Sequence, residues 1–109
     1  MSLKDGRYHL VGIGGIGVSA VARLLHARGL TVQGSDVRES QLTLALRELG
    51  IKVEIGHSAD HLEGVDVVIR STAIPATNPE LVAAKERGIL TVHRSEVLGW
   101  LMDTRQSVG

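Results

Sequence analysis

The feature that most constrains the fold is a glycine run that directly follows an apolar segment. Gly12, Gly14 and Gly17 have the spacing G-x-G-x-x-G, with apolar residues 10–13 leading into it and a helical pattern after it. In a strand–turn–helix unit the first glycine allows a tight turn, the second lets the backbone approach a diphosphate, and the third allows close helix–strand packing. A diphosphate would lie at the N-terminal amides of the helix, where the macrodipole favours negative charge. The run therefore predicts an α/β fold that binds a nucleotide diphosphate.

Strand-like and helix-like segments alternate along the chain. Apolar residues recur with helical spacing over residues 16–28, and Ser40 and Asn78 are predicted to cap two further helices. The polar residues 58–64 predict a turn or a short helix, and Ser95 is predicted to cap a last helix. The expected strands are short apolar runs over residues 10–13, 31–36, 51–55, 65–69 and 89–92.

Five strand–helix units with short connections predict an open parallel sheet with helices on both faces. Right-handed crossovers leave few other arrangements, and the expected Rossmann-like strand order is 3-2-1-4-5. Ligands of such a sheet bind at the carboxyl ends of the strands, where the order reverses between the first and fourth strands. The 109 residues fit a single domain with a core but are short for a complete nucleotide-dependent enzyme. A whole enzyme is expected to carry further domains.

The composition excludes several functional classes. Twelve basic and twelve acidic residues give a net charge of zero, so no overall field recruits nucleic acid or an anionic membrane. Cysteine is absent, which excludes disulfides, thiolate catalysis and thiolate metal sites. No segment approaches the roughly 20 apolar residues of a membrane helix, and the first residues lack the apolar part of a signal peptide. We therefore expect a cytoplasmic domain without a nucleic-acid or membrane partner.

Polar residues collect at the expected carboxyl ends of the strands. Asp36 ends the second strand, His57 follows the third, and Ser71 and Thr72 follow the fourth. Asp36 lies 24 positions after Gly12, where an acidic residue can hydrogen-bond a ribose or a base edge, although it could instead cap the local turn. The histidine could contact a base or be merely solvated, and the two hydroxyls could bind phosphate or cap loop backbone.

Other polar residues are assigned no role at this stage. Arg94 would suit a phosphate, but an arginine at such a position is more often on the surface. His9 is expected at the wrong end of the sheet for chemistry, and His61 is expected on an exposed surface. The sequence contains no metal-ligand spacing, no catalytic constellation and no G-x-x-x-x-G-K-[ST] loop for ATP. We predict that this chain binds a ligand and does not transform it.

Six segments together resemble the N-terminal domain of the Mur ligases, in the order and spacing of that family. The G-I-G-G of residues 12–15 replaces the G-I-C-G that is usual in the branch recycling muramyl tripeptide, so the resemblance favours the alanine-adding branch. Val18 and Thr72 stand where the family more often has methionine and serine, changes that affect packing or keep a hydroxyl. The segments are residues 9–22 (HLVGIGGIGVSAVA), 34–36 (GSD), 56–57 (GH), 67–74 (VVIRSTAI), 78–81 (NPEL) and 93–102 (HRSEVLGWLM).

The resemblance carries implications for domains and ligands. In Mur ligases the N-terminal domain holds the UDP part of UDP-N-acetylmuramate, a central domain binds ATP and Mg²⁺, and a third domain binds the amino acid. This chain ends at Gly109, about where the family's ATP loop begins, which implies that residues 1–109 are the first domain of a three-domain ligase with its other domains in cis. The implied UDP-binding residues are Gly12, Gly14, Gly15, Ile16, Gly17, Asp36, His57, Ser71 and Thr72, with no catalytic residue, metal or cofactor in this part.

Three alternatives remain open at this point. A regulatory NAD-binding module is possible because Asp36 suits an adenosine ribose equally well. The chain could also belong to the muramyl-tripeptide recycling ligase, or be an interaction domain that binds no nucleotide.

Overall fold

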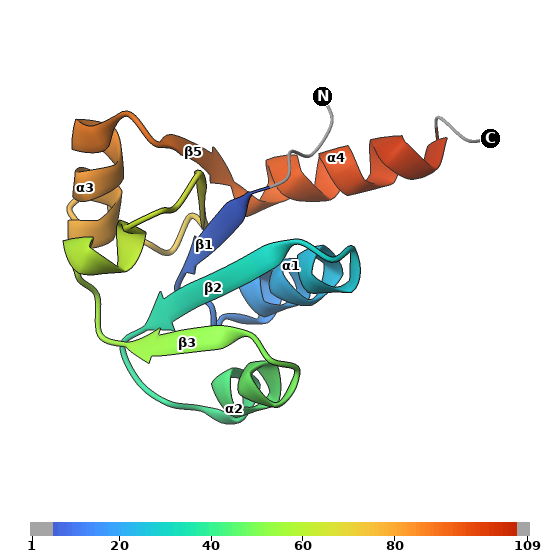
Figure 1. The fold of residues 1–109 in the computed structure, drawn as a ribbon, viewed down its shortest axis with the longest axis horizontal. Coiled ribbons are helices and arrows are strands. Elements are labelled where there is room, and N and C mark those ends of the chain that lie inside the picture. The colour runs from blue at the N-terminus through green and yellow to red at the C-terminus, as the bar shows by residue number, and fades with distance from the viewer. Residues whose placement is uncertain (1–5, 107–109) are drawn as a thin grey trace.

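A computed structural model describes residues 6–106 and the side chains of residues 6–101. It confirms a five-stranded, fully parallel sheet with the order β3-β2-β1-β4-β5 (Figure 1). None of the helices in this described range is long and apolar enough to cross a membrane. The elements are β1 (Arg7–Val11), α1 (Ile16–Ala27), β2 (Thr31–Asp36), α2 (Gln41–Glu48), β3 (Lys52–Ile55), the 3-10 helix η1 (Ala59–Leu62), β4 (Val67–Arg70), α3 (Pro79–Arg87), β5 (Leu90–His93) and α4 (Arg94–Gln106).

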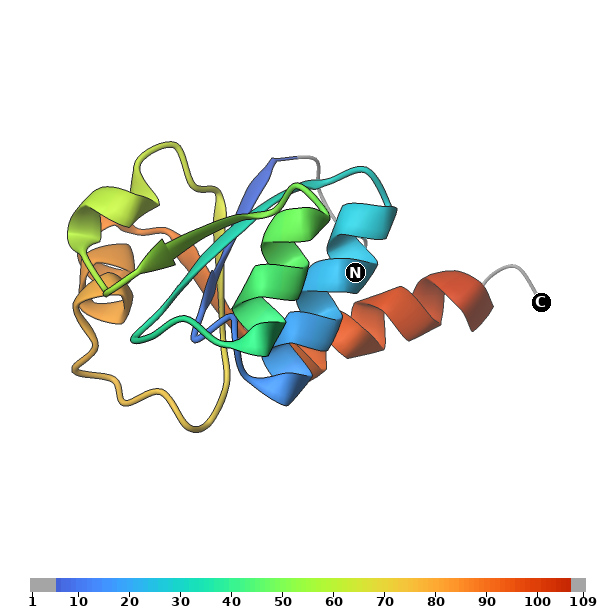
Figure 2. The same ribbon diagram turned by 90° about the horizontal axis from the view of Figure 1, so that it is seen from below.

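Helices cover both faces of the sheet, as predicted (Figure 2). On one face α1, α2 and α4 enclose a core that includes Leu10, Val21 and Val97. On the other face η1 and α3 enclose a smaller core that includes Val11 and Leu81. Leu10 and Val11 enter different cores because successive strand residues point to opposite faces. This alternation also decides which face receives each polar side chain of a strand.

Two of the predicted helix caps are confirmed. The Ser40 hydroxyl accepts a hydrogen bond from the Thr43 amide at 3.3 Å, and Thr43 Oγ1 accepts one in return from the Ser40 amide at 2.8 Å. Asn78 Oδ1 accepts from the Glu80 amide at 2.8 Å at the start of α3. The first of these arrangements is a reciprocal capping box, which satisfies two amides at the N-terminus of α2.

Strand β1 begins three residues earlier than the sequence predicted. Tyr8, His9 and Leu10 pair with both β2 and β4, whereas the predicted strand covered residues 10–13. Gly12, with φ of +74°, turns the chain out of the strand. The start of the strand was misplaced because the polar His9 interrupts the apolar pattern in the sequence. In the structure the strand is defined by its pairing with β2 on one side and β4 on the other.

The second strand has the predicted limits, 31–36, the remaining boundaries agree with the prediction within two residues, and one cap is corrected. Strands β4 and β5 lie further along the chain than predicted because their pairing with β1 and β4 sets their limits. Helix α4 begins at Arg94, so Ser95 lies within its first turn and is not its N-cap. The Ser95 hydroxyl instead hydrogen-bonds His93 Nδ1 at 2.9 Å.

The glycine loop is fixed against β2. The Gly12 and Ile13 amides both donate to the carbonyl oxygen of Ser35, at 2.8 and 2.9 Å. Ile13 also packs directly on the backbone of Gly34, where an added Cβ would lie 2.6 Å from Ile13 Cβ and 2.7 Å from the Leu10 carbonyl oxygen. These contacts hold the N-terminus of α1 at the carboxyl edge of the sheet.

Candidate functional site

A pocket of about 270 Å³ opens at the N-terminus of α1. It lies between the loops that follow β1 and β4, which are neighbours in the sheet where the strand order reverses. The sequence predicted five of its lining residues as site residues, and Arg94 from the start of α4 joins them. The lining residues are Gly15, Ile16, Gly17, Val18, Ser71, Thr72, Ala73 and Arg94.

The electrostatics of this pocket favour an anion. Gly15 is the N-cap of α1 and supplies no capping side chain, so the amides of Ile16, Gly17 and Val18 lack an intrahelical acceptor. The Arg94 guanidinium lies beside the same turn, since a Cβ added at Gly17 would be 2.9 Å from Arg94 Cζ. Free amides, the positive end of a helix and a guanidinium together suit a phosphate group.

Other amides of the glycine loop already have acceptors. The Gly14 amide donates to Asp36 Oδ2 at 2.8 Å, and the Gly15 amide donates to the Gly12 carbonyl oxygen at 3.0 Å. An added Cβ at Gly14 would lie 2.7 Å from Asp36 Oδ2 and 3.0 Å from Thr43 Cγ2. The second glycine of the motif therefore makes room for Asp36 and α2. Direct contact of Gly12 or Gly14 with a diphosphate stays a prediction, and neither residue lines the pocket.

A histidine orients the hydroxyl of Thr72 at the rim of the pocket. The Ser95 amide donates to His93 Nδ1 at 3.2 Å, so this nitrogen carries no hydrogen. The ring hydrogen then resides on Nε2, which donates to Thr72 Oγ1 at 2.9 Å. The hydroxyl keeps its own hydrogen free to donate to a ligand.

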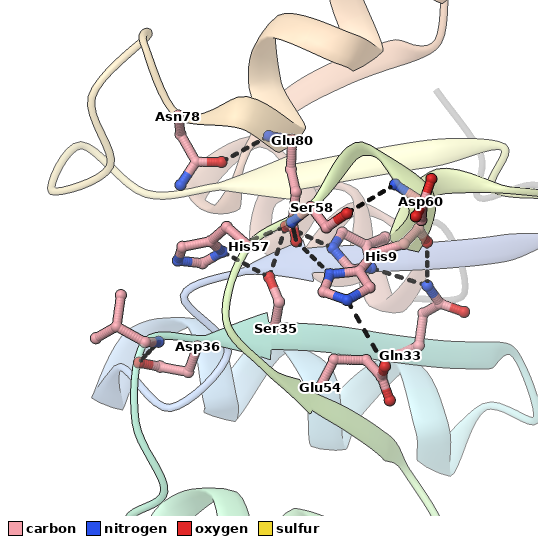
Figure 3. A network of polar contacts seen from close by, with 12 residues as sticks. His9, Gln33, Ser35, Asp36, Glu54, His57, Ser58, Asp60, Asn78 and Glu80 are labelled. Carbon is pink, nitrogen blue, oxygen red and sulfur yellow. Dashed lines mark hydrogen bonds and ion pairs between the residues drawn. The ribbon is translucent and has the colours of Figure 1, made fainter.

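Asp36 and His57 form a second group, at the carboxyl ends of β2 and β3 and outside the lining of the pocket (Figure 3). Both oxygens of Asp36 accept backbone hydrogen bonds, since Oδ1 accepts from the Val37 amide at 2.7 Å. His57 Nδ1 lies 3.0 Å from the Ser35 hydroxyl oxygen. The predicted site residues thus fall into two groups along one edge of the sheet.

A buried carboxylate hydrogen-bonds both Ser35, near the carboxyl edge of the sheet, and His9, in the interior (Figure 3). Glu80 in the first turn of α3 is fully buried and accepts hydrogen bonds at both oxygens. At Oε1 the donors are His9 Nε2, at 2.8 Å, and the Ser35 hydroxyl, at 2.5 Å. At Oε2 they are His61 Nδ1, at 2.6 Å, and the Ser58 amide, at 3.1 Å. We call these five residues the Glu80 network.

The donors of this network keep the carboxylate ionised. Burial alone would raise the pKa of Glu80, but hydrogen bonds from His9, Ser35 and His61 outweigh it and lower the pKa from 4.5 to about 2. His9 Nδ1 lies 2.9 Å from the Gln33 amide group, which donates to the His61 carbonyl oxygen, so the ring hydrogen of His9 on Nε2 points to Glu80. The electrostatic attraction of His9 adds to this hydrogen bond in lowering the pKa of Glu80.

The sequence-based expectation that His61 lies on an exposed surface was wrong, and the sequence did not predict that His9 joins a buried network. His9 is fully buried because η1 and α3 cover its face of the sheet, and the side chain of His61, which lies on η1 itself, is only 15% exposed because it hydrogen-bonds Glu80. A pattern in the sequence could have revealed this. His9 pairs with Gln33 in the sheet, and Ser35 follows two positions later, so all three polar side chains share one face of buried strands.

Chemically, the site offers backbone amides, hydroxyls and a guanidinium as hydrogen-bond donors. Within the described part of the chain, no group of three or more histidine, aspartate or glutamate side chains has the geometry to hold a metal ion. The ring nitrogens of the Glu80 network that face the carboxylate are engaged in hydrogen bonds. The arrangement is that of a binding edge with an anion pocket.

Comparison with known proteins defines the family. The family described as "Mur ligase family, catalytic domain" matches residues 7–106. The chain belongs to the Mur ligase family. The UDP-N-acetylmuramate–L-alanine ligase of Kineococcus radiotolerans is 50% identical over 106 residues, which cover 94% of this chain and 22% of that relative. This chain thus spans about a fifth of the length of the curated relatives that it matches.

Solved structures of Mur ligases share the fold. A UDP-N-acetylmuramate–alanine ligase from Thermotoga maritima superposes with a TM-score of 0.82 at 39% identity, over 94% of this chain and 23% of that one. A murein peptide ligase from Psychrobacter arcticus gives a TM-score of 0.80 at 25% identity, over 85% of this chain and 20% of that one. The higher identities therefore fall on the alanine-adding branch, as the glycine run indicated.

Proposed function

We propose that this chain is the UDP-binding, N-terminal domain of an ATP-dependent cytoplasmic ligase that joins L-alanine to UDP-N-acetylmuramate during peptidoglycan precursor synthesis. The observation that carries the proposal is the uncapped N-terminus of α1 with Arg94 beside it, in a chain half identical to alanine-adding ligases. Free amides and a guanidinium fit the diphosphate that this substrate carries.

The proposed ligand runs along the carboxyl edge of the sheet. Its diphosphate would contact the amides of residues 16–18, the Arg94 guanidinium and the hydroxyls of Ser71 and Thr72. Its uridine would lie near Asp36 and His57, at the ends of β2 and β3. Strand β3 is two strand spacings, about 10 Å, from β1, so an extended nucleoside diphosphate would connect the two groups of residues.

The chemistry itself is assigned to other domains of the proposed ligase. ATP and Mg²⁺ would bind there, because this sequence has no phosphate loop with a lysine. Those domains would close over the muramyl group, so the present chain alone is expected to bind its ligand weakly.

Titration of the chain with UDP-N-acetylmuramate, UDP and NADH tests the proposal. We expect the two uridine compounds to bind and NADH not to bind. Arg94→Gln should weaken UDP binding by about 1.5–3 kcal/mol, the range for a hydrogen bond to a charged group. Arg28→Gln, at the exposed opposite end of α1, is the matched control and should change nothing. Micromolar binding of NADH without binding of UDP would overturn the proposal in favour of an NAD module.

A further inference from the structure

We propose that Glu80, acting through the Ser35 hydroxyl, holds His57 in the tautomer that presents a hydrogen-bond acceptor at the carboxyl edge of the sheet, and that this acceptor selects uracil over cytosine. Glu80 and Ser35 are then positioning residues, and His57 is the residue that contacts the base. This inference rests on the proposed function, because it concerns how the uridine end of the ligand is recognised.

The direction of each hydrogen bond follows from the donors available. The ionised carboxylate of Glu80 only accepts, so the Ser35 hydroxyl, 2.5 Å from Oε1, directs its single hydrogen to Glu80. Ser35 Oγ can therefore only accept from His57 Nδ1, at 3.0 Å. The hydrogen of the neutral His57 ring is thus on Nδ1, and its Nε2 carries a lone pair.

The free nitrogen of His57 faces the proposed uridine position. The side chain is 13% exposed, and Nε2 neither has a hydrogen-bond partner among the described residues nor belongs to their buried unpaired atoms. Figure 3 shows the His57 ring beyond Ser35, at the same end of the sheet as Asp36 and away from His9. Uracil carries a ring N–H between two carbonyl groups, whereas the matching nitrogen of cytosine carries a lone pair. An acceptor at this place therefore favours uracil.

Only a carboxylate at position 80 maintains this arrangement. The four groups that hydrogen-bond Glu80 are all donors, and one of them, the Ser58 amide, is backbone and cannot reverse its role. His57 Nδ1 also lies 3.5 Å from Glu80 Oε1, so the carboxylate favours a hydrogen on this nitrogen directly as well as through Ser35. In Glu80→Gln the amide oxygen would face Ser58, which turns the NH₂ group toward His9 and Ser35. The Ser35 oxygen would then accept from that NH₂ group and donate to His57 Nδ1. The ring hydrogen would move to Nε2, and the acceptor would become a donor.

Nitrogen-15 NMR of the histidine rings at pH 7.5 tests the positioning role. In the 109-residue chain we expect a pyrrole-type shift for His57 Nδ1 and a pyridine-type shift for Nε2, and we expect Glu80→Gln to exchange the two. Glu54→Gln is the matched control, because the Glu54 carboxylate lies 3.6 Å from His61 in the same cluster, and although Glu54 pairs with Ser35 through the β2–β3 backbone, its side chain makes no hydrogen bond or ion pair with Ser35 or His57. It should leave the His57 shifts unchanged.

Parallel titrations with UDP and CDP test base selection. We expect the wild-type chain to prefer UDP by about tenfold or more, the effect of one hydrogen bond against an unpaired acceptor. Glu80→Gln should lose this preference and Glu54→Gln should keep it. If Glu80→Gln does not fold, Ser35→Ala serves instead, because it removes the acceptor at 3.0 Å from His57 Nδ1 and leaves only Glu80 Oε1, at 3.5 Å, while Glu80 keeps three donors.

The two proposals fail in different ways. UDP binding by a wild-type chain whose His57 carries its hydrogen on Nε2 would overturn the inference and leave the proposed function standing. An unchanged preference for UDP over CDP in a folded Glu80→Gln or Ser35→Ala variant would also overturn it. If neither UDP nor UDP-N-acetylmuramate binds the wild-type chain, the proposed function fails, and base selection fails with it.

Discussion

Acidification should lower the free energy of unfolding of this domain, because Glu80 becomes protonated more readily in the unfolded chain than in the folded one. Hydrogen bonds lower the pKa of this carboxyl group from 4.5 to about 2 in the folded state. A folded-state pKa below the unfolded value means that the unfolded chain binds the proton more readily. The stabilisation is therefore complete above pH 4.5 and is lost as the pH falls from there toward 2.

The size of the effect follows from the two pKa values. A fall from 4.5 to about 2 corresponds to about 3 kcal/mol of stability at neutral pH. By pH 3.5 about 1–2 kcal/mol of this is lost, since the unfolded carboxyl is then mostly protonated and the folded one is not. Glu80→Gln lacks the titrating group and leaves donors facing one another. It should be less stable than the wild type by about 3 kcal/mol at pH 7.

Urea unfolding of the wild type and Glu80→Gln, at pH 7 and at pH 3.5, measures this contribution. The difference in free energy of unfolding between the two chains should narrow by about 1–2 kcal/mol at the lower pH. Glu86→Gln, at an exposed position of the same helix, is the control and should stay within about 0.5 kcal/mol of the wild type at pH 7. A difference that is the same at both pH values would refute the reasoning.

Three further predictions concern glycines inside and outside the glycine loop, and the activity. Gly34→Ala should destabilise the fold by about 1–3 kcal/mol, because its Cβ would lie 2.6 Å from Ile13 Cβ. Gly99→Ala is the comparison: it lies in open space on α4 and should stabilise the fold by up to about 1 kcal/mol. Urea unfolding measures the free energy of unfolding of both variants. Gly14→Val should lower both the melting temperature and the affinity for UDP, because its Cβ would lie 2.7 Å from Asp36 Oδ2; an unchanged melting temperature would contradict this. The pure chain should release no ADP from ATP, even with UDP-N-acetylmuramate and L-alanine present.

The order of the strands was predictable because it follows from local signals. The glycine run, the Ser40 and Asn78 caps and the apolar runs each mark an element within a few residues, and right-handed crossovers then fix the topology. The limits of the strands were less predictable. β1 starts at Arg7 because residues 31 and 67, far along the chain, supply its pairing partners, and no local pattern encodes them.

The anion pocket and the Glu80 network also differ in how far the sequence predicts them. Gly15 and Thr72 lie in the loops after β1 and β4, and Gly17 lies in the first turn of α1, so the position of the strand ends was enough to bring them to one pocket. Arg94 was passed over because its place beside α1 depends on where α4 begins. The Glu80 network was missed because it depends on tertiary contacts between elements that were assigned no role.

The Glu80 network also bears on how the chain folds. Its defining contact joins His9 to Glu80 across 71 positions of sequence, so a long loop must close before the carboxylate meets its donors. Until then, docking of α3 would bury a charge without partners, which is strongly unfavourable. Early packing of α3 against the sheet, before the donors of Glu80 are in place, is thus disfavoured. We expect β1, α1 and β2 to assemble early through local pairing and the face beneath η1 and α3 to close in the rate-limiting step, after both neighbours of β1 are in place.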